Sequence, residues 1–174
     1  MEKQILDSLF NDSLIAIYAD KDDTETFYVG KIKHLNEDSF ILQSYTSNGL
    51  KDGYILIRNI DVFEIRKDNL YLNKLKRLIT NHYRFNENNS LNFEDNIEYD
   101  ICYIVNECRN KKMFVCIKSI YGYKLRGKII DIINNEYIYI DCYTEDGIKD
   151  GMSLIKYEDI QSISFNGIYE NIIL

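Results

Sequence analysis

The chain repeats itself at long range. The stretch from Ser44 to Gly53 returns in altered form from Cys142 to Gly151, 98 residues further on. Six positions are identical between the copies: Tyr45, Thr46, Gly49, Lys51, Asp52 and Gly53 in the first, and Tyr143, Thr144, Gly147, Lys149, Asp150 and Gly151 in the second. Repetition of this kind is the signature of a duplicated structural unit. We therefore predict two copies of one domain, residues 1–69 and 97–174, joined by residues 70–96.

The repeated stretch has the composition of a turn. Asn48-Gly49 and Asp146-Gly147 are strong turn dipeptides, because glycine adopts a positive φ without a Cβ clash. The Asp-Gly pairs that end each stretch, at residues 52–53 and 150–151, add a second turn signal. Two interpretations remain open, a structural hairpin loop and a duplicated binding loop. We favour the first, since the turn itself requires Gly and Asp.

The flanking segments indicate a mainly β chain. Apolar, β-branched and aromatic runs predict five strands in each half, at 14–19, 27–35, 40–46, 54–58 and 62–66, and at 114–120, 123–132, 137–143, 153–156 and 160–165. Apolar residues with helical spacing predict helices over 2–10, 70–85 and 97–110. We expect two tandem five-stranded SH3-like barrels, each preceded by a helix and joined by a helical linker, because closure removes sheet edges that a small domain cannot cover.

Two motifs in each half resemble those of the Sm-like (LSm) family, nearest in pattern to its Hfq branch of bacterial RNA chaperones. Val29–Leu35 and Leu125–Ile132 resemble the family's bent second strand around one Gly, and Ile57–Asp61 and Ile155–Asp159 stand where its second motif lies. The resemblance implies a small barrel, RNA binding, and pairing of the fourth strand of one barrel with the fifth strand of the next.

This chain also departs from the family pattern. Asn36 and Ile133 stand where the family usually has Asp. The run that contacts RNA in the bacterial branch is replaced by Arg58-Asn59-Ile60 and by Lys156-Tyr157-Glu158. The family's RNA pocket therefore does not carry over residue by residue.

The charge balance limits which partners are plausible. The net charge is −7 and the pI about 4.9, which argues against a general polyanion binder. An RNA site would have to be a local basic patch with aromatic side chains for stacking. The candidates for such a patch are Lys74, Lys76, Arg77, Arg84 and Tyr83 in one cluster, and Lys124, Arg126, Lys128 and Tyr123 in another. The alternative is that these side chains only form a solvated surface whose positive charge is balanced by nearby acidic residues.

The residues do not indicate an enzyme. No nucleophile, base and acid stand at recognisable spacing, and no glycine-rich phosphate loop is present. A zinc site from His82, Cys102 and Cys108 lacks a fourth ligand, so we expect no metal and no cofactor. No apolar run reaches the ~18 residues of a membrane span, and no signal peptide is visible. We expect a reduced, cytoplasmic protein with no membrane partner.

Two hypotheses about function follow. The first is a non-catalytic Sm-like protein that binds RNA through a local basic patch. The second is an acidic module for protein–protein interaction or assembly, without nucleic acid. For either one we expect self-association between a monomer and a trimer.

The two turn glycines give the first testable prediction. Gly49→Val or Gly147→Val should lower the free energy of unfolding by about 1 kcal/mol or more, because a β-branched side chain is strained at positive φ. Urea unfolding of each variant measures the loss. An unchanged stability would show that the turns do not need glycine.

Overall fold

The computed structural model describes residues 3–10, 13–83, 93, 97–145 and 147–167. The helices are α1 (Lys3–Phe10), α2 (Leu70–Tyr83) and α3 (Ile101–Asn110). The strands are β1 (Ile15–Tyr18), β2 (Tyr28–Leu35), β3 (Ser39–Tyr45), β4 (Lys51–Arg58), β5 (Glu64–Lys67), β6 (Phe114–Ser119), β7 (Lys124–Ile133), β8 (Tyr137–Tyr143), β9 (Lys149–Lys156) and β10 (Ile160–Phe165). Two 3-10 turns, Asn59–Asp61 and Tyr157–Asp159, precede β5 and β10. The predicted mainly β architecture is confirmed.

The ten strands form a single sheet in the order β5-β1-β2-β3-β4-β10-β6-β7-β8-β9. Each half has the same internal order, with its fifth strand beside its first and then the second, third and fourth. The predicted repeat of strand order is therefore confirmed. The prediction of two closed barrels is wrong, because the fourth strand of the first half pairs with the fifth strand of the second half and not with its own.

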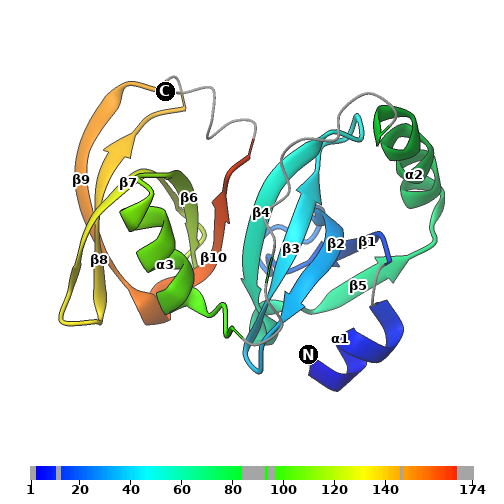
Figure 1. The fold of residues 1–174 in the computed structure, drawn as a ribbon, viewed down its shortest axis with the longest axis horizontal. Helices are drawn as coiled ribbons and strands as arrows, with labels where there is room; N and C mark the ends of the chain where they lie inside the picture. The colour runs from blue at the N-terminus through cyan, green and yellow to red at the C-terminus, as the bar shows by residue number, and fades with distance from the viewer. Residues whose placement is uncertain (1–2, 11–12, 84–92, 94–96, 146, 168–174) are drawn as a thin grey trace.

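The junction between the halves is the antiparallel pairing of β4 with β10. Leu56 lies opposite Ile163, and Tyr54 lies opposite Phe165. Figure 1 shows the two halves side by side, with these two strands adjacent at their boundary. One of the two strands that would have closed each barrel, β4 in the first half and β10 in the second, is thus used between the halves, which joins them into one sheet.

Further polar contacts cross the same boundary. Lys118 of β6 pairs with Asp20, and both side chains are largely buried. Although burial alone would raise it, the hydrogen bond and charge of Lys118 hold the pKa of Asp20 below its ordinary value. The side-chain amide of Gln161 donates to the Ala19 carbonyl at 2.7 Å. These bonds satisfy polar groups that the junction removes from water.

Each half has an apolar core covered by a helix. Leu6 of α1 lies in the first core, while Ile104, Val105 and Cys108 of α3 lie in the second. The second core also takes in Ile41, Tyr54 and Leu56 from the outer face of the first half. The prediction that α3 begins at residue 97 is wrong, because Asp100 caps the helix by accepting a 2.7 Å bond from the Tyr103 amide.

The remaining helix, α2, packs on the first half alone. Leu72, Leu75 and Ile79 of α2 pack on Leu14, Ala16, Tyr18, Val29 and Tyr45. Figure 1 shows α2 at the far end of the first half, away from the junction. The structure agrees with the predicted helix over 70–85 as far as Tyr83; residues 84 and 85 lie outside the described residues.

The loop within each repeated stretch is shorter than predicted from the sequence, because β4 begins at Lys51 and β9 at Lys149. In each half the Thr hydroxyl accepts from the amide four residues on, Thr46 from Leu50 and Thr144 from Ile148. Gly49 and Gly147 have φ of 82° and 77°, so their predicted left-handed conformation is confirmed. The second turn expected at residues 52–53 and 150–151 is wrong, because β4 and β9 begin at Lys51 and Lys149 and both glycines lie within strands.

Gly53 and Gly151 occupy equivalent strand positions with φ of 70° and 80°. A Cβ on Gly53 would lie 2.4 Å from both the Gly167 nitrogen and the Phe165 oxygen. A Cβ on Gly151 would have nothing within 4 Å among the described atoms. The difference arises because the end of β10 lies against β4, whereas no described strand lies beyond β9.

This pair gives a matched test of the junction. Gly53→Ala and Gly151→Ala should each cost about 1 kcal/mol through the positive φ. Gly53→Ala should cost roughly 1–3 kcal/mol more, because its methyl group collides with backbone. Urea unfolding of the two variants compares them directly. Equal losses would mean that β10 does not lie against β4.

Candidate functional site

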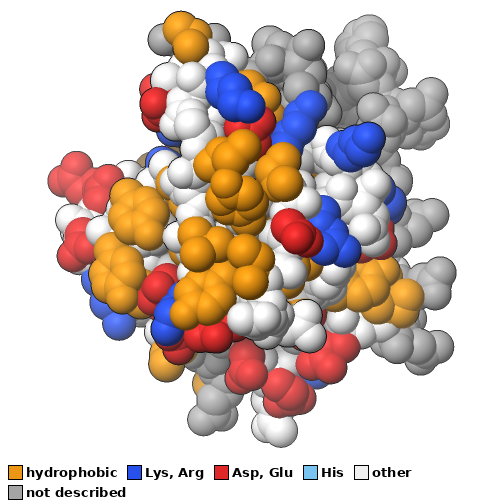
Figure 2. Space-filling model, turned by 90° about the vertical axis from the view of Figure 1, so that its left-hand side faces the viewer, with side chains coloured by type: hydrophobic (Ala, Val, Ile, Leu, Met, Phe, Trp, Pro, Cys, Tyr) orange, Lys and Arg blue, Asp and Glu red, His pale blue; other side chains and the backbone are white. Residues whose placement is uncertain are grey.

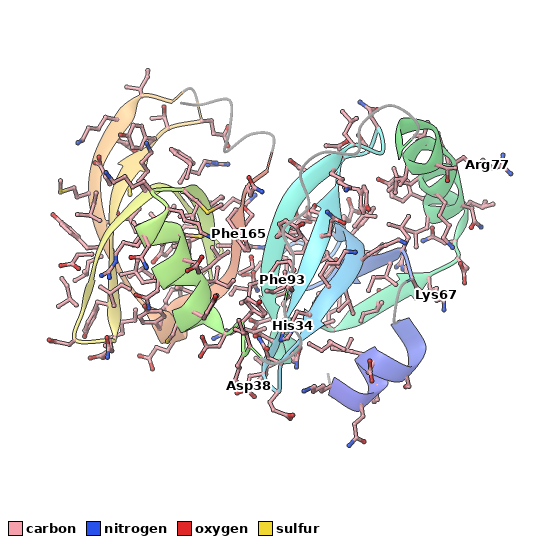
Figure 3. The ribbon with its side chains drawn as sticks, in the orientation of Figure 1. His34, Asp38, Lys67, Arg77, Phe93 and Phe165 are labelled. Carbon is pink, nitrogen blue, oxygen red and sulfur yellow. The ribbon has the colours of Figure 1, made fainter. Side chains whose placement is uncertain are left out.

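The residues predicted to bind RNA fall into two separate places. Lys74, Lys76 and Arg77 lie on α2, and Lys76 pairs with Asp68 at 2.6 Å. Figure 3 shows Arg77 at the far end of the first half, well away from the junction marked by Phe93 and Phe165. Arg84 and the side chain of Tyr83 lie outside the described residues.

The second cluster lies in the other half. Lys124, Arg126 and Lys128 are on β7, directly after Tyr123, and Arg126 pairs with Glu145. Because α2 and β7 belong to opposite halves of the molecule (Figure 1), the structure does not bring the two predicted clusters together. The two clusters therefore do not form one continuous basic surface.

The repeated-loop residues have identifiable structural roles. Tyr45 is buried against α2, and the ring of Tyr143 lies 5.6 Å from that of Phe114. Lys149 pairs with Asp141 at 3.0 Å on the outer side of β8 and β9. The remaining members, Thr46, Gly49, Lys51, Asp52, Gly53, Thr144, Gly147, Asp150 and Gly151, form the two turns and the strand starts described above. These contacts match the structural interpretation of the repeat.

The feature that sequence reasoning missed is an exposed apolar surface at the β9 end of the sheet. Met152 and Leu154 of β9 are each 54% exposed. We call these two residues, with the neighbouring Tyr139 of β8, the β9 face; Tyr139 lies opposite Leu154, and its hydroxyl lies 2.7 Å from the Met152 sulfur. Figure 2 looks onto this end of the molecule and shows hydrophobic side chains gathered there.

The internal repeat supplies a reference for this surface. The equivalents of Met152 and Leu154 in the first half are Tyr54 and Leu56, which are 2% and 0% exposed. Strand β10 pairs with β4, and the ring of Phe165 stacks on that of Tyr54 at 5.9 Å. The same kind of strand surface is therefore covered in one half and open in the other.

The opposite end of the sheet has a different chemistry. Strand β5 carries Glu64, Arg66 and Lys67. Arg66 pairs with Glu64 at 2.6 Å and lies 4.5 Å above the Tyr18 ring. Charged side chains on an edge strand oppose pairing with another strand. Of the two end strands, β5 is thus charged along most of its length, whereas β9 has its charges, Lys149, Asp150 and Lys156, toward its ends and apolar side chains at its centre.

An apolar cavity of about 410 Å³ lies between α3 and the end of β10. Its aromatic wall includes Phe93, Tyr99 and Tyr103, whose neighbouring rings are 5.0 Å apart. Burial raises the pKa of the Cys108 thiol in this wall to about 12, so the thiol is protonated at neutral pH and is a poor nucleophile. The cavity offers packing space without an activated group.

A second, polar cavity of about 660 Å³ lies beside α1. Three of its charged residues take part in ion pairs within the molecule: Lys3 with Glu37 at 3.4 Å, and Arg58 with Asp61 at 2.8 Å. Arg58 also donates to the Glu158 carbonyl at 2.8 Å, which ties it to the other half. Most of the charge in this cavity is therefore balanced within the molecule.

Neither the family comparison nor the search of curated proteins identifies a relative: no protein-family model and no curated protein matches this sequence. Across the described residues, no three His, Cys, Asp or Glu side chains gather in a way that could hold a metal ion. None of the described helices is both long and apolar enough to cross a membrane.

Proposed function

We propose that this chain is a non-catalytic module for protein–protein interaction, and that the β9 face is the surface it uses. The observation that carries the proposal is the contrast between Tyr54 and Leu56, which are buried, and Met152 and Leu154, which are half exposed. The first pair is covered by β10 of the same chain together with the apolar core that β10 belongs to, including Phe93 at 5.2 Å from the Tyr54 ring. The second pair has the same strand position and similar chemistry, so the partner that fits it is a strand that brings further apolar side chains with it.

The energetics of an open sheet edge support this proposal. A strand at the end of a sheet has unpaired backbone groups that can pair with another chain, and natural edges are usually protected by charge. Strand β5 has that protection, whereas the central positions of β9 hold Met152, Ser153 and Leu154. Covering apolar area is favourable at roughly 25 cal/mol per Å². A protein partner would therefore gain both ladder hydrogen bonds and apolar burial at β9.

We also propose that each half is an Sm-like unit. The pairing of β4 with β10 supports this proposal, since it is the contact between fourth and fifth strands that the resemblance implies. The short helix before each set of five strands supports it as well. Fold resemblance alone does not decide what such a unit binds.

RNA binding is the second candidate function, and one observation favours it. The rings of Tyr121 and Tyr123 stack within 14° of parallel, are 67% and 48% exposed, and stand beside Lys124. Exposed aromatic rings next to cations are a stacking platform for single-stranded nucleic acid. Against it, the Tyr121 hydroxyl donates to the Asp159 carboxylate, and Asp22 lies close to Gly122. This acidic setting makes the protein partner the better-supported candidate.

Photo-crosslinking in the native host separates the two candidates. A benzoylphenylalanine at position 154 should form covalent adducts with protein, and the same group at the exposed position Ile60, beside α1 in the first half, is the control. Protein adducts at 154 that are no more abundant than at 60 would contradict the proposal. RNA adducts from the group at position 123, with none of protein at 154, would establish the second candidate in its place.

A further inference from the structure

The β9 face raises the question of which chain covers it. A chain that covers this face would be the protein partner of the proposed function, so its identification rests on that proposal. The junction of β4 with β10 shows what a covering strand looks like in this molecule. On the outer side of β4, which faces the core of the second half, Leu56 and Tyr54 lie opposite Ile163 and Phe165. On its inner side, which faces the core of the first half, Ile55 and Ile57 lie opposite Ser164 and Ser162.

The other end strand of a second copy, β5, does not meet these requirements. At the places equivalent to Ser162 and Ser164 of β10, strand β5 has Glu64 and Arg66. Ser162 is buried, and its hydroxyl lies 3.3 Å from the Tyr28 hydroxyl. The residue equivalent to Tyr28 in the second half is Leu125, since both stand two positions before the glycine of the second strand.

Joining β5 of one copy to β9 of the next would therefore be unfavourable. It would take the Glu64–Arg66 ion pair out of water beside the Leu125 side chain, where no hydroxyl corresponds to that of Tyr28. Removing an ion pair from water is costly even when the pair stays intact. The structure thus disfavours head-to-tail chains and rings formed from these two edges.

A second copy of β9 does meet the requirements. Two β9 strands placed antiparallel, with Ser153 opposite Ser153, bring Met152 of each copy opposite Leu154 of the other. Directly opposite residues of an antiparallel pair lie on the same face and contact each other. The outer side then has two apolar pairs, as at Leu56–Ile163 and Tyr54–Phe165. The inner side has the small Ser153 pair at its centre, where the β4–β10 junction also places serines.

We propose that two copies of this chain associate through β9, antiparallel, about a two-fold axis at Ser153. Such an interface is isologous, because each copy contributes the same residues. The sheet continues across the axis from one copy to the other, as it already continues from β4 to β10. The contact uses the apolar end of each molecule and leaves the charged β5 strands at the two outer ends, so assembly stops at two copies.

Light scattering of the purified chain tests the stoichiometry. The native protein should have twice the monomer mass of 20.6 kDa. Leu154→Glu should return the mass to that of one copy, because it places two carboxylates in the apolar pairs. Ile148→Glu is the matched control, since Ile148 is also exposed but lies outside the paired segment of β9, and it should leave the mass doubled. A native mass of one copy, or of three or more, overturns the proposal.

A disulfide tests the register. Directly opposite residues in an antiparallel pair have Cα atoms about 4.5–5.5 Å apart, within the range that a disulfide spans. Ser153→Cys, in a Cys102→Ser background that removes the exposed native thiol, should form a disulfide between copies when treated with oxidised glutathione. Adding Leu154→Glu should reduce that yield to the level of Tyr121→Cys in the same background. Equal yields from positions 153 and 121 overturn the register.

The same experiments separate this inference from the proposed function. A native monomer whose position 154 crosslinks to a different protein in the host overturns the dimer and leaves the interaction surface in place. A dimer that persists in Leu154→Glu, with no protein adducts at 154, overturns both.

Discussion

The pairing of β4 with β10 is the contact on which the rest of the structure depends. It supplies the hydrogen-bonding partner for the fourth strand of the first half and for the last strand of the second. It buries Tyr54 and Leu56 in the core of the other half. It also brings Lys118 to Asp20 and the side-chain amide nitrogen of Gln161 to the Ala19 carbonyl, so these donors removed from water at the boundary are bonded. The two halves are consequently one folded unit built from a repeat.

Using the fourth strand of one half and the fifth strand of the other has a consequence at the ends. One fifth strand, β5, and one fourth strand, β9, are left as the outer strands of the sheet. Glu64 and Arg66 protect β5 by charge, whereas β9 has Met152 and Leu154 at the positions that are buried in its counterpart. The proposed interaction surface is thus the second instance of a contact that the chain makes once within itself.

Local patterns in the sequence were sufficient for most of the elements. The repeat predicted the shared strand order, and the glycines of the turns predicted their positive φ. The sequence did not reveal the strand position of Gly53, because the Asp-Gly pair that signals a turn also suits a glycine in a distorted strand. It placed the start of α3 too early, because apolar spacing continues through Ile97 while the cap is Asp100.

The long-range partners could not be predicted in the same way. Tyr54-Ile55-Leu56 and Met152-Ser153-Leu154 are equivalent segments, and nothing within either segment states which one β10 covers. That choice depends on contacts between residues about a hundred positions apart, such as Arg58 with Glu158. The two basic clusters were close to aromatic residues in sequence, yet the fold places them in opposite halves.

Residue-resolved native-state hydrogen exchange tests the central claim that the β4–β10 junction makes the two halves one unit. Amides in the interior strands of both halves, including β4 and β10 at the junction, should exchange with one common free energy of opening, equal to that of global unfolding. If the amides of β6, β7 and β8 exchange at a distinctly lower free energy while those of β2 and β3 stay protected, the halves open independently and the claim is contradicted.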